Sequence, residues 1–425
     1  MGAEDRRTAG FKAVTRLAEA RARLLAGVEP LDRTEPVALL DADGRAVAEP
    51  VVAERPVPHY ARASMDGYAV RAEDTFGASA RSPVVLEPAE TPGPNRAVRV
   101  HTGSELPDGA DAVVMLEQVE AVGDELEVFD AVAEGEHVGP VGEDVAAGAT
   151  LFEPTHQLRP SDLGLLKSVG LTSVRVVERP RVAVVPTGEE LVQADPGPGE
   201  IIETNGQTVS QLAARWGADP SYREVVTDDH DALREAITAD LDHDVVVTTG
   251  GSSVGARDLV PEVVAELGEV LVHGVALKPG HPVALGRVEG TPVVMLPGYP
   301  VACIVNAVQF LRPLVKRLGR LPDRAPPTVP ARLDRKLASE PGTRTFARVR
   351  LEPVPAADGD ADDGSGGDGR PADDDPAFLA VPTRASGSGV LSSVALADGW
   401  VVVPESLDGL DAGTVVPVER WEWSA

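Results

Sequence analysis

The stretch that decides the fold is DVVVTTGGSSVGARD, residues 244–258, in which an apolar run leads into a glycine-rich loop. The three valines predict a buried strand, and the glycines after Thr249 predict a tight turn. The segment that follows, LVPEVVAELG, predicts a helix. A strand that passes through a glycine-rich loop into a helix is the repeating unit of layered α/β domains.

The same alternation extends to both sides of this stretch, over residues 181–318. Further strands are predicted at 181–186, 221–226, 283–287 and 292–296, and further helices at 207–217, 229–241 and 301–318. Asp229 is placed to cap the helix that it begins. Because strands alternate with helices, we predict a doubly wound α/β domain, with an open and mostly parallel sheet covered on both faces.

The segments around this domain predict mostly β structure. Short valine-rich runs separated by Gly, Pro and Asp fill residues 51–178, and a proline-rich boundary at 319–330 precedes further short strands. An amphipathic helix is predicted at 8–26. The segment 358–375 has no apolar residue larger than alanine or proline, so we expect a disordered, acidic hairpin tip.

Composition limits the class of protein. The chain has 425 residues and a net charge of −29, from 39 basic and 68 acidic residues. Several domains fit this length, duplex nucleic acid would be repelled, and no apolar run is long enough to cross a bilayer. The single cysteine, Cys303, excludes an internal disulfide, and without a signal peptide we expect a cytoplasmic protein. The acidic, lysine-poor composition is typical of a high-salt cytoplasm, so a halophilic source is predicted.

The loop at 248–258 is a candidate phosphate site. Its glycines let the backbone approach an anion closely, its serine hydroxyls can donate to phosphate oxygens, and the following helix N-terminus favours negative charge. The residues concerned are Gly250, Gly251, Ser252, Ser253 and Gly255. Ligands of open α/β sheets bind outside the carboxyl ends of the strands, where this loop is predicted to lie. The alternative is an ordinary glycine turn that binds nothing.

Three acidic side chains are expected at the same edge of the sheet. Glu190 follows the first strand, Asp228 follows the second, and Asp258 ends the glycine-rich loop. Together they predict a Mg²⁺ site beside the phosphate, although each alone could be a helix cap. Lys278, in the turn KPGHP, is a candidate phosphate contact, with an ordinary exposed lysine as the alternative.

Seven separated motifs resemble those of one family in their order and spacing. They are MDGYAV at 65–70, TGSELPDGADAVVM at 102–115, GED at 142–144, PTGEEL at 186–191, TTGGSSVG at 248–255, KPGHP at 278–282 and LPGYP at 296–300. From about Phe11 to the C-terminus, the chain is similar to the molybdopterin molybdenumtransferases, the MoeA and gephyrin E-domain family. Taken alone, Asp66 and Gly67 would be typical of a two-residue type I′ hairpin.

The resemblance implies an elongated homodimer, in which the doubly wound, MogA-like domain of one subunit faces a β-rich domain of its partner. Four parts are implied for each subunit. They are an extended linking domain at 26–50 and 148–178, a β-rich domain at 51–147, the doubly wound domain at 1–25 and 179–320, and a C-terminal β domain at 321–425 with a disordered acidic insert at about 356–376.

The resemblance also implies an activity, the Mg²⁺-dependent insertion of molybdate or tungstate into adenylylated molybdopterin with release of AMP. The adenylyltransferase of the same pathway is an implied partner. Matching the family's motifs assigns catalytic positions to Asp66, which would come from the partner subunit, and to Thr102, Asp144, Glu190, Asp228 and Asp258. Substrate contacts are assigned to Lys278, Pro297, Gly298 and Pro300.

Departures from the family pattern leave alternatives open. His281 stands where the family has a second lysine, Tyr299 where it has asparagine, and His273 with Gly274 where it has a basic residue. Fewer fixed positive charges favour weaker binding of an anionic ligand. The choice between molybdate and tungstate stays open, as does a non-catalytic pterin-binding or scaffolding role. The extra β domains count against a third alternative, a related adenylyltransferase.

Overall fold

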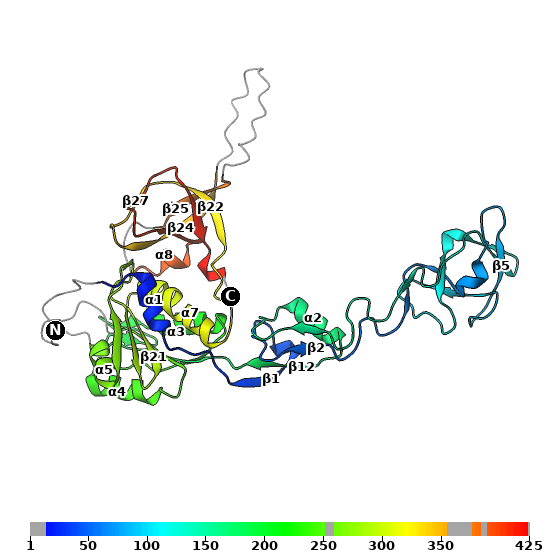
Figure 1. The fold of residues 1–425 in the computed structure, drawn as a ribbon. Helices are drawn as coiled ribbons and strands as arrows, with labels where there is room; N and C mark the ends of the chain where they lie inside the picture. The colour runs from blue at the N-terminus through cyan, green and yellow to red at the C-terminus, as the bar shows by residue number, and fades with distance from the viewer. Residues whose placement is uncertain (1–13, 251–258, 355–375, 384–388, 424–425) are drawn as a thin grey trace, which may run out of the picture. The chain divides into compact units, whose positions relative to one another are not determined.

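The computed structural model describes residues 14–250, 259–354, 376–383 and 389–423 of the chain (Figure 1). The chain divides into two compact units, one of Thr34–Val176 and one of Met1–Arg33 with Val177–Ala425. No helix in these described ranges is long and apolar enough to cross a membrane.

A six-stranded sheet lies at the centre of the unit that contains the glycine-rich loop. The strand order is β16-β13-β17-β21-β20-β18. The strands are β13 (Arg181–Pro186), β16 (Asp219–Tyr222), β17 (Val245–Thr249), β18 (Glu269–His273), β20 (Ala284–Val288) and β21 (Thr291–Leu296). The first four strands in this order are parallel, and the steps from β21 to β20 and from β20 to β18 are antiparallel. The predicted doubly wound, mostly parallel sheet is confirmed.

Helices cover both faces of this sheet (Figure 1). On one face lie α4 (His230–Ala239) and α5 (Leu259–Leu267), which pack against each other. The other face carries α1 (Leu17–Leu25), α3 (Asn205–Arg215) and a long helix made of α6 (Pro300–Asn306), a π-helical turn (Ala307–Leu311) and α7 (Arg312–Leu318). Asp229 caps α4 as predicted, because its carboxylate accepts hydrogen bonds from the amides of Asp231 and Ala232, each 3.0 Å long.

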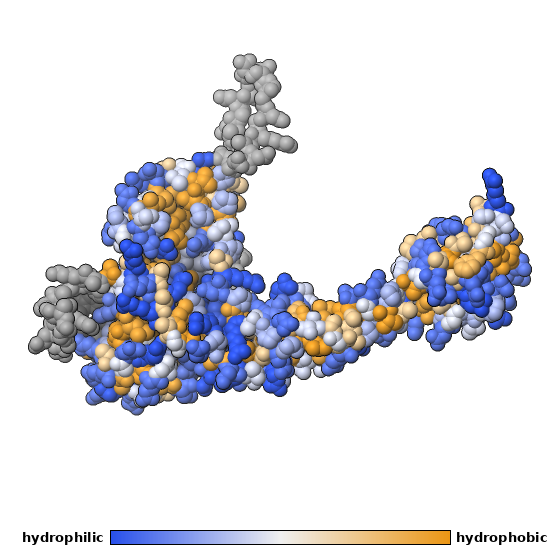
Figure 2. All heavy atoms as spheres, in the orientation of Figure 1, coloured by the Kyte–Doolittle hydropathy of each residue, from blue (hydrophilic) through white to orange (hydrophobic). Residues whose placement is uncertain are grey.

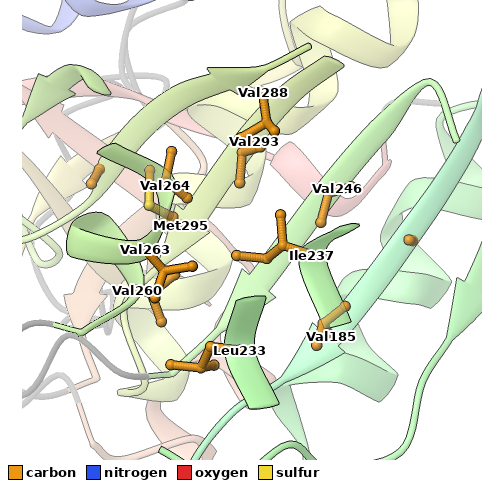
Figure 3. Packing of buried hydrophobic residues seen from close by; sticks show 12 residues of the cluster. Val185, Leu233, Ile237, Val246, Val260, Val263, Val264, Val288, Val293 and Met295 are labelled. Atoms are coloured by element: carbon orange, nitrogen blue, oxygen red, sulfur yellow. The ribbon is translucent and has the colours of Figure 1, made fainter. Parts of the chain in front are cut away.

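The core between the sheet and α4–α5 is made of aliphatic side chains (Figure 3). Leu233 and Ile237 of α4 and Val260 and Val264 of α5 meet Val246 of β17, and each of the five is at most 1% exposed. Full burial of such a side chain contributes roughly 1.5–3 kcal/mol each. This layer holds the strands in register and so fixes where their carboxyl ends lie.

Two predicted elements differ at their ends. The N-terminal helix begins at Leu17, because the backbone of Thr15 bonds instead to the carbonyl of Gly274 and the amide of Ala276. Residues 8–13 of the predicted helix lie outside the described residues. The second strand is β16, residues 219–222, and the chain beyond it leaves the ladder, since only the isolated bridge between Thr187 and Val226 continues the pairing.

The long helix contains an irregularity that its sequence explains. Pro313 has no N–H, so the carbonyl of Gln309, four residues earlier, cannot receive its usual helical hydrogen bond. Residues 307–311 form the π-helical turn at this place. Arg21 of α1 donates instead, with its Nε 3.1 Å from the Gln309 carbonyl oxygen. The proline therefore gives α1 an anchor on the long helix.

The C-terminal part forms a second six-stranded sheet, which closes on itself. Its strands are β19 (Leu277–Lys278), β22 (Thr328–Leu333), β24 (Arg344–Pro353), β25 (Phe378–Pro382), β26 (Gly399–Val403) and β28 (Val415–Glu419). The order is β19-β24-β25-β22-β28-β26, and β24 also pairs with β26. The predicted acidic insert joins β24 to β25, which pair as an antiparallel hairpin, and residues 355–375 within it lie outside the described residues. Because β19 belongs to the KPGHP turn, this sheet is joined directly to the α/β layers.

The other unit is mostly β, as predicted. Its largest sheet has the order β7-β4-β6-β5-β9-β8, formed by β4 (Gly67–Val70), β5 (Val84–Pro88), β6 (Arg96–Val100), β7 (Ala112–Met115), β8 (Val119–Val122) and β9 (Glu125–Val128). Smaller pairs join β1 (Thr34–Ala38) to β12 (Ser173–Val177) and β2 (Val51–Val52) to β11 (Thr150–Phe152). This unit also contains a helix, α2 (Pro160–Ser168), which the sequence did not predict. A proline lies in its first turn, and Asp162 makes a capping contact there.

The core described above gives a stability prediction. Ile237→Ala should lower the free energy of unfolding by about 2–5 kcal/mol, because it removes a fully buried side chain and leaves a cavity. The matched control is Leu396→Ala, at a side chain that is 70% exposed, which should change it by less than about 0.5 kcal/mol. Urea denaturation followed by circular dichroism measures both. Equal losses in the two variants would contradict the assigned core.

Candidate functional site

The turns that follow β13, β17 and β21 meet at the carboxyl edge of the parallel sheet. The amide of Thr187 donates to the carbonyl of Thr249, and the amide of Gly250 donates to the carbonyl of Leu296, both at 3.1 Å. The amide of Gly188 donates to the carbonyl of Val226, also at 3.1 Å, which adds the segment after β16. These backbone bonds fix the positions of the predicted site turns relative to one another.

Gly250 is required by this packing. Its φ is +132°, and a Cβ at this position would lie 2.0 Å from the carbonyl oxygen of Thr187. Gly298 packs against it, since a Cβ on Gly298 would lie 3.5 Å from the Cα of Gly250. Asn205, at the start of α3, holds the second turn by donating to the carbonyl of Gly298 at 2.7 Å. Gly250 therefore has a structural role, because it allows two turns to approach each other closely. The predicted role in approaching an anion is separate from this one.

Part of the predicted phosphate loop lies outside the described residues. This applies to Gly251, Ser252, Ser253, Gly255 and Asp258. The threonines at the base of the loop are described. Thr187, Thr248 and Thr249 are at most 1% exposed, and their hydroxyl oxygens have no hydrogen-bond partner within the described part of the chain. Polar atoms of this kind cost about 1–3 kcal/mol each when they stay unpaired.

Asp228 and Glu190 lie close enough to influence each other. Burial raises the pKa of Asp228, and the negative charges of Glu190 and then Glu189 raise it further. One carboxylate oxygen of Asp228, Oδ1, is buried and has no hydrogen-bond partner among the described residues. Glu190 and the neighbouring acid Glu189 are thus near enough for their charges to act on Asp228. Grouped carboxylate oxygens of this kind are the ligands that divalent cations prefer in proteins.

A separate acidic group lies elsewhere and is satisfied internally. Asp240, Asp242 and His243 place their ligand atoms within 4.8 Å of one another. Arg223 binds Asp240 through two hydrogen bonds, and His243 contacts Asp242 and Ser221 at 2.9 and 3.2 Å. These contacts give the cluster a structural role, joining the end of α4 to the strands.

Lys278 lies in β19, the strand of the C-terminal sheet that, among the described residues, pairs only with β24. Its ammonium donates to Glu340 at 2.9 Å, and this contact lowers the pKa of the Glu340 carboxyl. Both side chains are exposed. The sequence interpretation missed Glu340, because nothing in the local pattern places residue 340 beside residue 278. A phosphate ligand of Lys278 would have to compete with this carboxylate.

Asn306 is a second missed residue, and it shapes the turn that carries Lys278. It is fully buried in α6, and its Nδ2 donates to the carbonyls of Gly280 and Ala302 at 2.9 and 2.8 Å. Gly280 has φ +111°, and a Cβ there would lie 2.1 Å from Nδ2. A polar residue within the apolar run VACIVNAVQF was the signal that could have identified it.

The LPGYP turn leads from β21 into α6. Pro297 is buried, and Pro300 occupies the first turn of the helix, where a missing N–H costs nothing. Tyr299 is 49% exposed, and its ring lies beside Gly389, which precedes the short helix α8 (Ser392–Ala395), since a Cβ on that glycine would be 3.3 Å from Cδ1. Tyr299 therefore lies next to the C-terminal part of the chain.

In the other unit, Asp66 and Thr102 are brought together. Asp66 Oδ1 accepts from the amide of Thr102 at 2.6 Å and from its hydroxyl at 2.8 Å. These two hydrogen bonds are the main reason why the pKa of Asp66 is lowered, and His101 and Arg99 lower it further. Asp144 is exposed, and its amide donates to the carbonyl of Val57 at 3.0 Å.

The type I′ hairpin suggested by Asp66 and Gly67 alone is not formed. Gly67 begins β4, which pairs with β6 and β7, whereas the preceding strand β3 (Arg62–Ala63) pairs with β10 (Val138–Gly139). A Cβ on Gly67 would lie 2.0 Å from the carbonyl oxygen of Val114, so the glycine serves close packing of strands. The segment is a crossing between two sheets and leaves the carboxylate of Asp66 at the surface.

Family models match most of the chain. Residues 15–170 match "MoeA N-terminal region (domain I and II)", residues 183–317 match "Probable molybdopterin binding domain", and residues 369–421 match "MoeA C-terminal region (domain IV)". These boundaries agree with the positions of the site turns, which fall in the first two regions.

Individual relatives match most of the chain. A molybdopterin molybdenumtransferase of Bacillus subtilis is 31% identical over 418 residues, which is 92% of each chain. One from a Nostoc species is 34% identical and covers 68% of this chain and 70% of its own. The solved structure of a molybdopterin biosynthesis MoeA protein from Pyrococcus horikosii superimposes with a TM-score of 0.78 at 34% identity, over 96% of this chain and 99% of that one. The chain belongs to the MoeA family.

Proposed function

We propose that this protein is a molybdopterin molybdenumtransferase, which inserts molybdate or tungstate into adenylylated molybdopterin and releases AMP in a Mg²⁺-dependent reaction. The named relatives support the activity. The observation that carries the site assignment is Asp228 at the carboxyl edge of the sheet. One of its carboxylate oxygens is buried without a hydrogen-bond partner among the described residues, and Glu190 and Glu189 lie nearby. The edge is where open α/β sheets bind their ligands.

The proposed division of labour follows the chemistry of each group. Glu190 and Asp228, with Asp258, would hold Mg²⁺, which when bound offsets the negative charge of the pyrophosphate that is cleaved. Lys278 would hold a phosphate oxygen after exchanging its contact with Glu340. Pro297, Gly298 and Pro300 shape the turn beside Gly250 and would wall the pterin site.

Asp66 has properties that suit a positioning role. Thr102 occupies one carboxylate oxygen with two hydrogen bonds, which keeps the group ionised and fixes its direction. We propose that Asp66, Thr102 and Asp144 act from the partner subunit of a homodimer. What supports this is that they belong to a compact unit other than the one that holds Asp228 and Lys278.

We place the protein in a high-salt cytoplasm, on the net charge of −29. In Figure 2, hydrophilic residues cover much of the visible surface of the α/β layers. The adenylyltransferase of the same pathway is the proposed source of the substrate. A non-catalytic pterin-binding role is the second candidate, favoured by Tyr299 and His281 and by the contact of Lys278 with Glu340.

Release of AMP separates the two candidates. Purified protein with adenylylated molybdopterin, Mg²⁺ and molybdate or tungstate in high salt should release AMP. Asp228→Asn should slow this by about a hundred-fold or more, because a charge that holds the cation is lost. The control Asp219→Asn, at an exposed carboxylate at the start of β16, should keep the wild-type rate. Bound pterin without AMP release in the wild type would favour the non-catalytic role.

The raised pKa of Asp228 predicts how the stability of the fold depends on pH. Because the fold disfavours the ionised carboxylate, ionised Asp228 lowers the free energy of unfolding at neutral pH. This destabilisation disappears as the pH falls below 3.8, the ordinary pKa of the group, whereas a carboxylate with a lowered pKa would behave in the opposite way. In EDTA at neutral pH, Asp228→Asn should therefore raise the melting temperature, while Asp219→Asn leaves it unchanged. Mg²⁺ should stabilise the wild type and Asp219→Asn, and have little effect on Asp228→Asn. A lower melting temperature of Asp228→Asn in EDTA would contradict the assignment.

Salt dependence tests the proposed setting. With 68 acidic and 39 basic residues, the fold carries strong self-repulsion that ions screen. The melting temperature should rise by several degrees between about 0.1 M and 2 M KCl, a range over which the screening length falls from about 10 Å to a few Å. Sucrose at equal osmolarity is the control for effects that do not involve charge. Full stability at low ionic strength would argue against a high-salt source.

A further inference from the structure

A cavity of about 310 Å³ lies between α1, the long helix, the linker after it and the start of β24. Four arginines from these separate elements line it: Arg21, Arg312, Arg324 and Arg344. Arg312 lies twelve residues along the long helix from Pro300, which corresponds to about 18 Å. The cavity is thus well separated from the LPGYP turn of the proposed active site.

The acids in and around this cavity do not balance its arginines. Asp323 pairs with Arg312 at 3.0 Å, and Glu405, outside the lining, pairs with Arg344 at 3.1 Å. The carboxylate of Glu419 accepts the indole N–H of Trp400 at 2.8 Å. Within the described residues, no carboxylate forms an ion pair with Arg21 or Arg324. The cavity therefore carries an excess of positive charge, although the chain as a whole has a net charge of −29.

The arginines also act on one another. Burial lowers the pKa of Arg21, and among its neighbours Arg312 and Arg344 lower it while Asp323 raises it. Lys316, one turn after Arg312, is only 1% exposed, and burial followed by the charge of Arg312 lowers its pKa to about 8. Positive charges held together in this way repel, and a bound anion is what relieves such repulsion.

Two of the four arginines are held in place by the surrounding structure. Arg21 is held by Gln309, whose carbonyl and side-chain oxygens accept from it at 3.1 and 2.9 Å. That carbonyl is available because Pro313 cannot donate to it. Arg312 is 5% exposed, and its Nε is buried without a hydrogen-bond partner in the described part of the chain. The lining therefore includes a buried guanidinium whose hydrogen-bonding capacity the described residues do not fully satisfy.

We propose that this cavity binds a phosphate-class oxyanion, either free phosphate or the phosphate group of a small metabolite. Guanidinium groups match two oxygens of a phosphate at once, which favours this class of ligand over a halide. The volume is at the lower end of the range for small-molecule sites and leaves room for a small organic body beside the phosphate. This site is additional to the proposed active site and does not depend on the transferase activity.

The test measures the binding of two probes to the full-length protein by isothermal titration calorimetry. The probes are inorganic phosphate and glycerol 3-phosphate, at the lowest salt concentration at which the circular dichroism of the protein is unchanged. Arg324→Gln is the main variant, because its side chain is exposed and its loss should not disturb the core. Arg21→Gln is the second variant. The matched control is Arg350→Gln, which removes an exposed guanidinium from β24 outside the cavity.

Arg324→Gln and Arg21→Gln should each weaken phosphate binding on the order of ten-fold, as expected for the loss of a charge-assisted contact, whereas Arg350→Gln stays within about two-fold of the wild type. Tighter binding of glycerol 3-phosphate than of phosphate would assign the ligand to the phosphorylated metabolites, and equal binding would assign it to phosphate itself. If both cavity variants bind phosphate as tightly as the wild type, the phosphate binds elsewhere, for example at the glycine-rich loop. That result would overturn the proposal.

Discussion

The parallel pairing of β17 between β13 and β21 is the constraint on which the rest of the unit depends. It places three strand ends side by side, and the bonds from Thr187 to Thr249 and from Gly250 to Leu296 then join the turns that follow them. A glycine is needed at 250, because the carbonyl of Thr187 occupies the space of a side chain. Glu190, Asp228 and the LPGYP turn have their positions because this edge is closed so tightly. The charges of Glu190 and Asp228 can therefore act on each other.

The sequence predicted those features that depend on local pattern. The alternation of apolar runs predicted the sheet, the cap at Asp229 followed from its side chain, and the approach of Glu190 to Asp228 followed from the rule that parallel strands end at one edge. The contacts between distant segments were not predictable in this way. Glu340 beside Lys278 and Arg21 beside Gln309 join residues 62 and 288 positions apart, and no local period encodes them.

Glycines and prolines were the residues whose interpretation changed most. Gly67 was compatible with a hairpin, yet it is required by the close approach of Val114. Pro313 lies inside the helix predicted at 301–318, and its missing N–H leaves the Gln309 carbonyl free to accept from Arg21. Both effects depend on which backbone atom lies nearby, and this is known only from the fold. Motif order, in contrast, was enough to indicate the family, because seven separated motifs constrain the whole chain at once.

We propose that the carboxylates at the sheet edge form one divalent-cation site. Binding of Mn²⁺, as a paramagnetic substitute for Mg²⁺, can be followed by electron paramagnetic resonance of the unbound ion in the wild type and in Glu190→Gln. The account predicts one site per chain in the wild type, with affinity reduced on the order of ten-fold or more in Glu190→Gln, because an anionic ligand is lost. Equal Mn²⁺ affinity in the two proteins would contradict it.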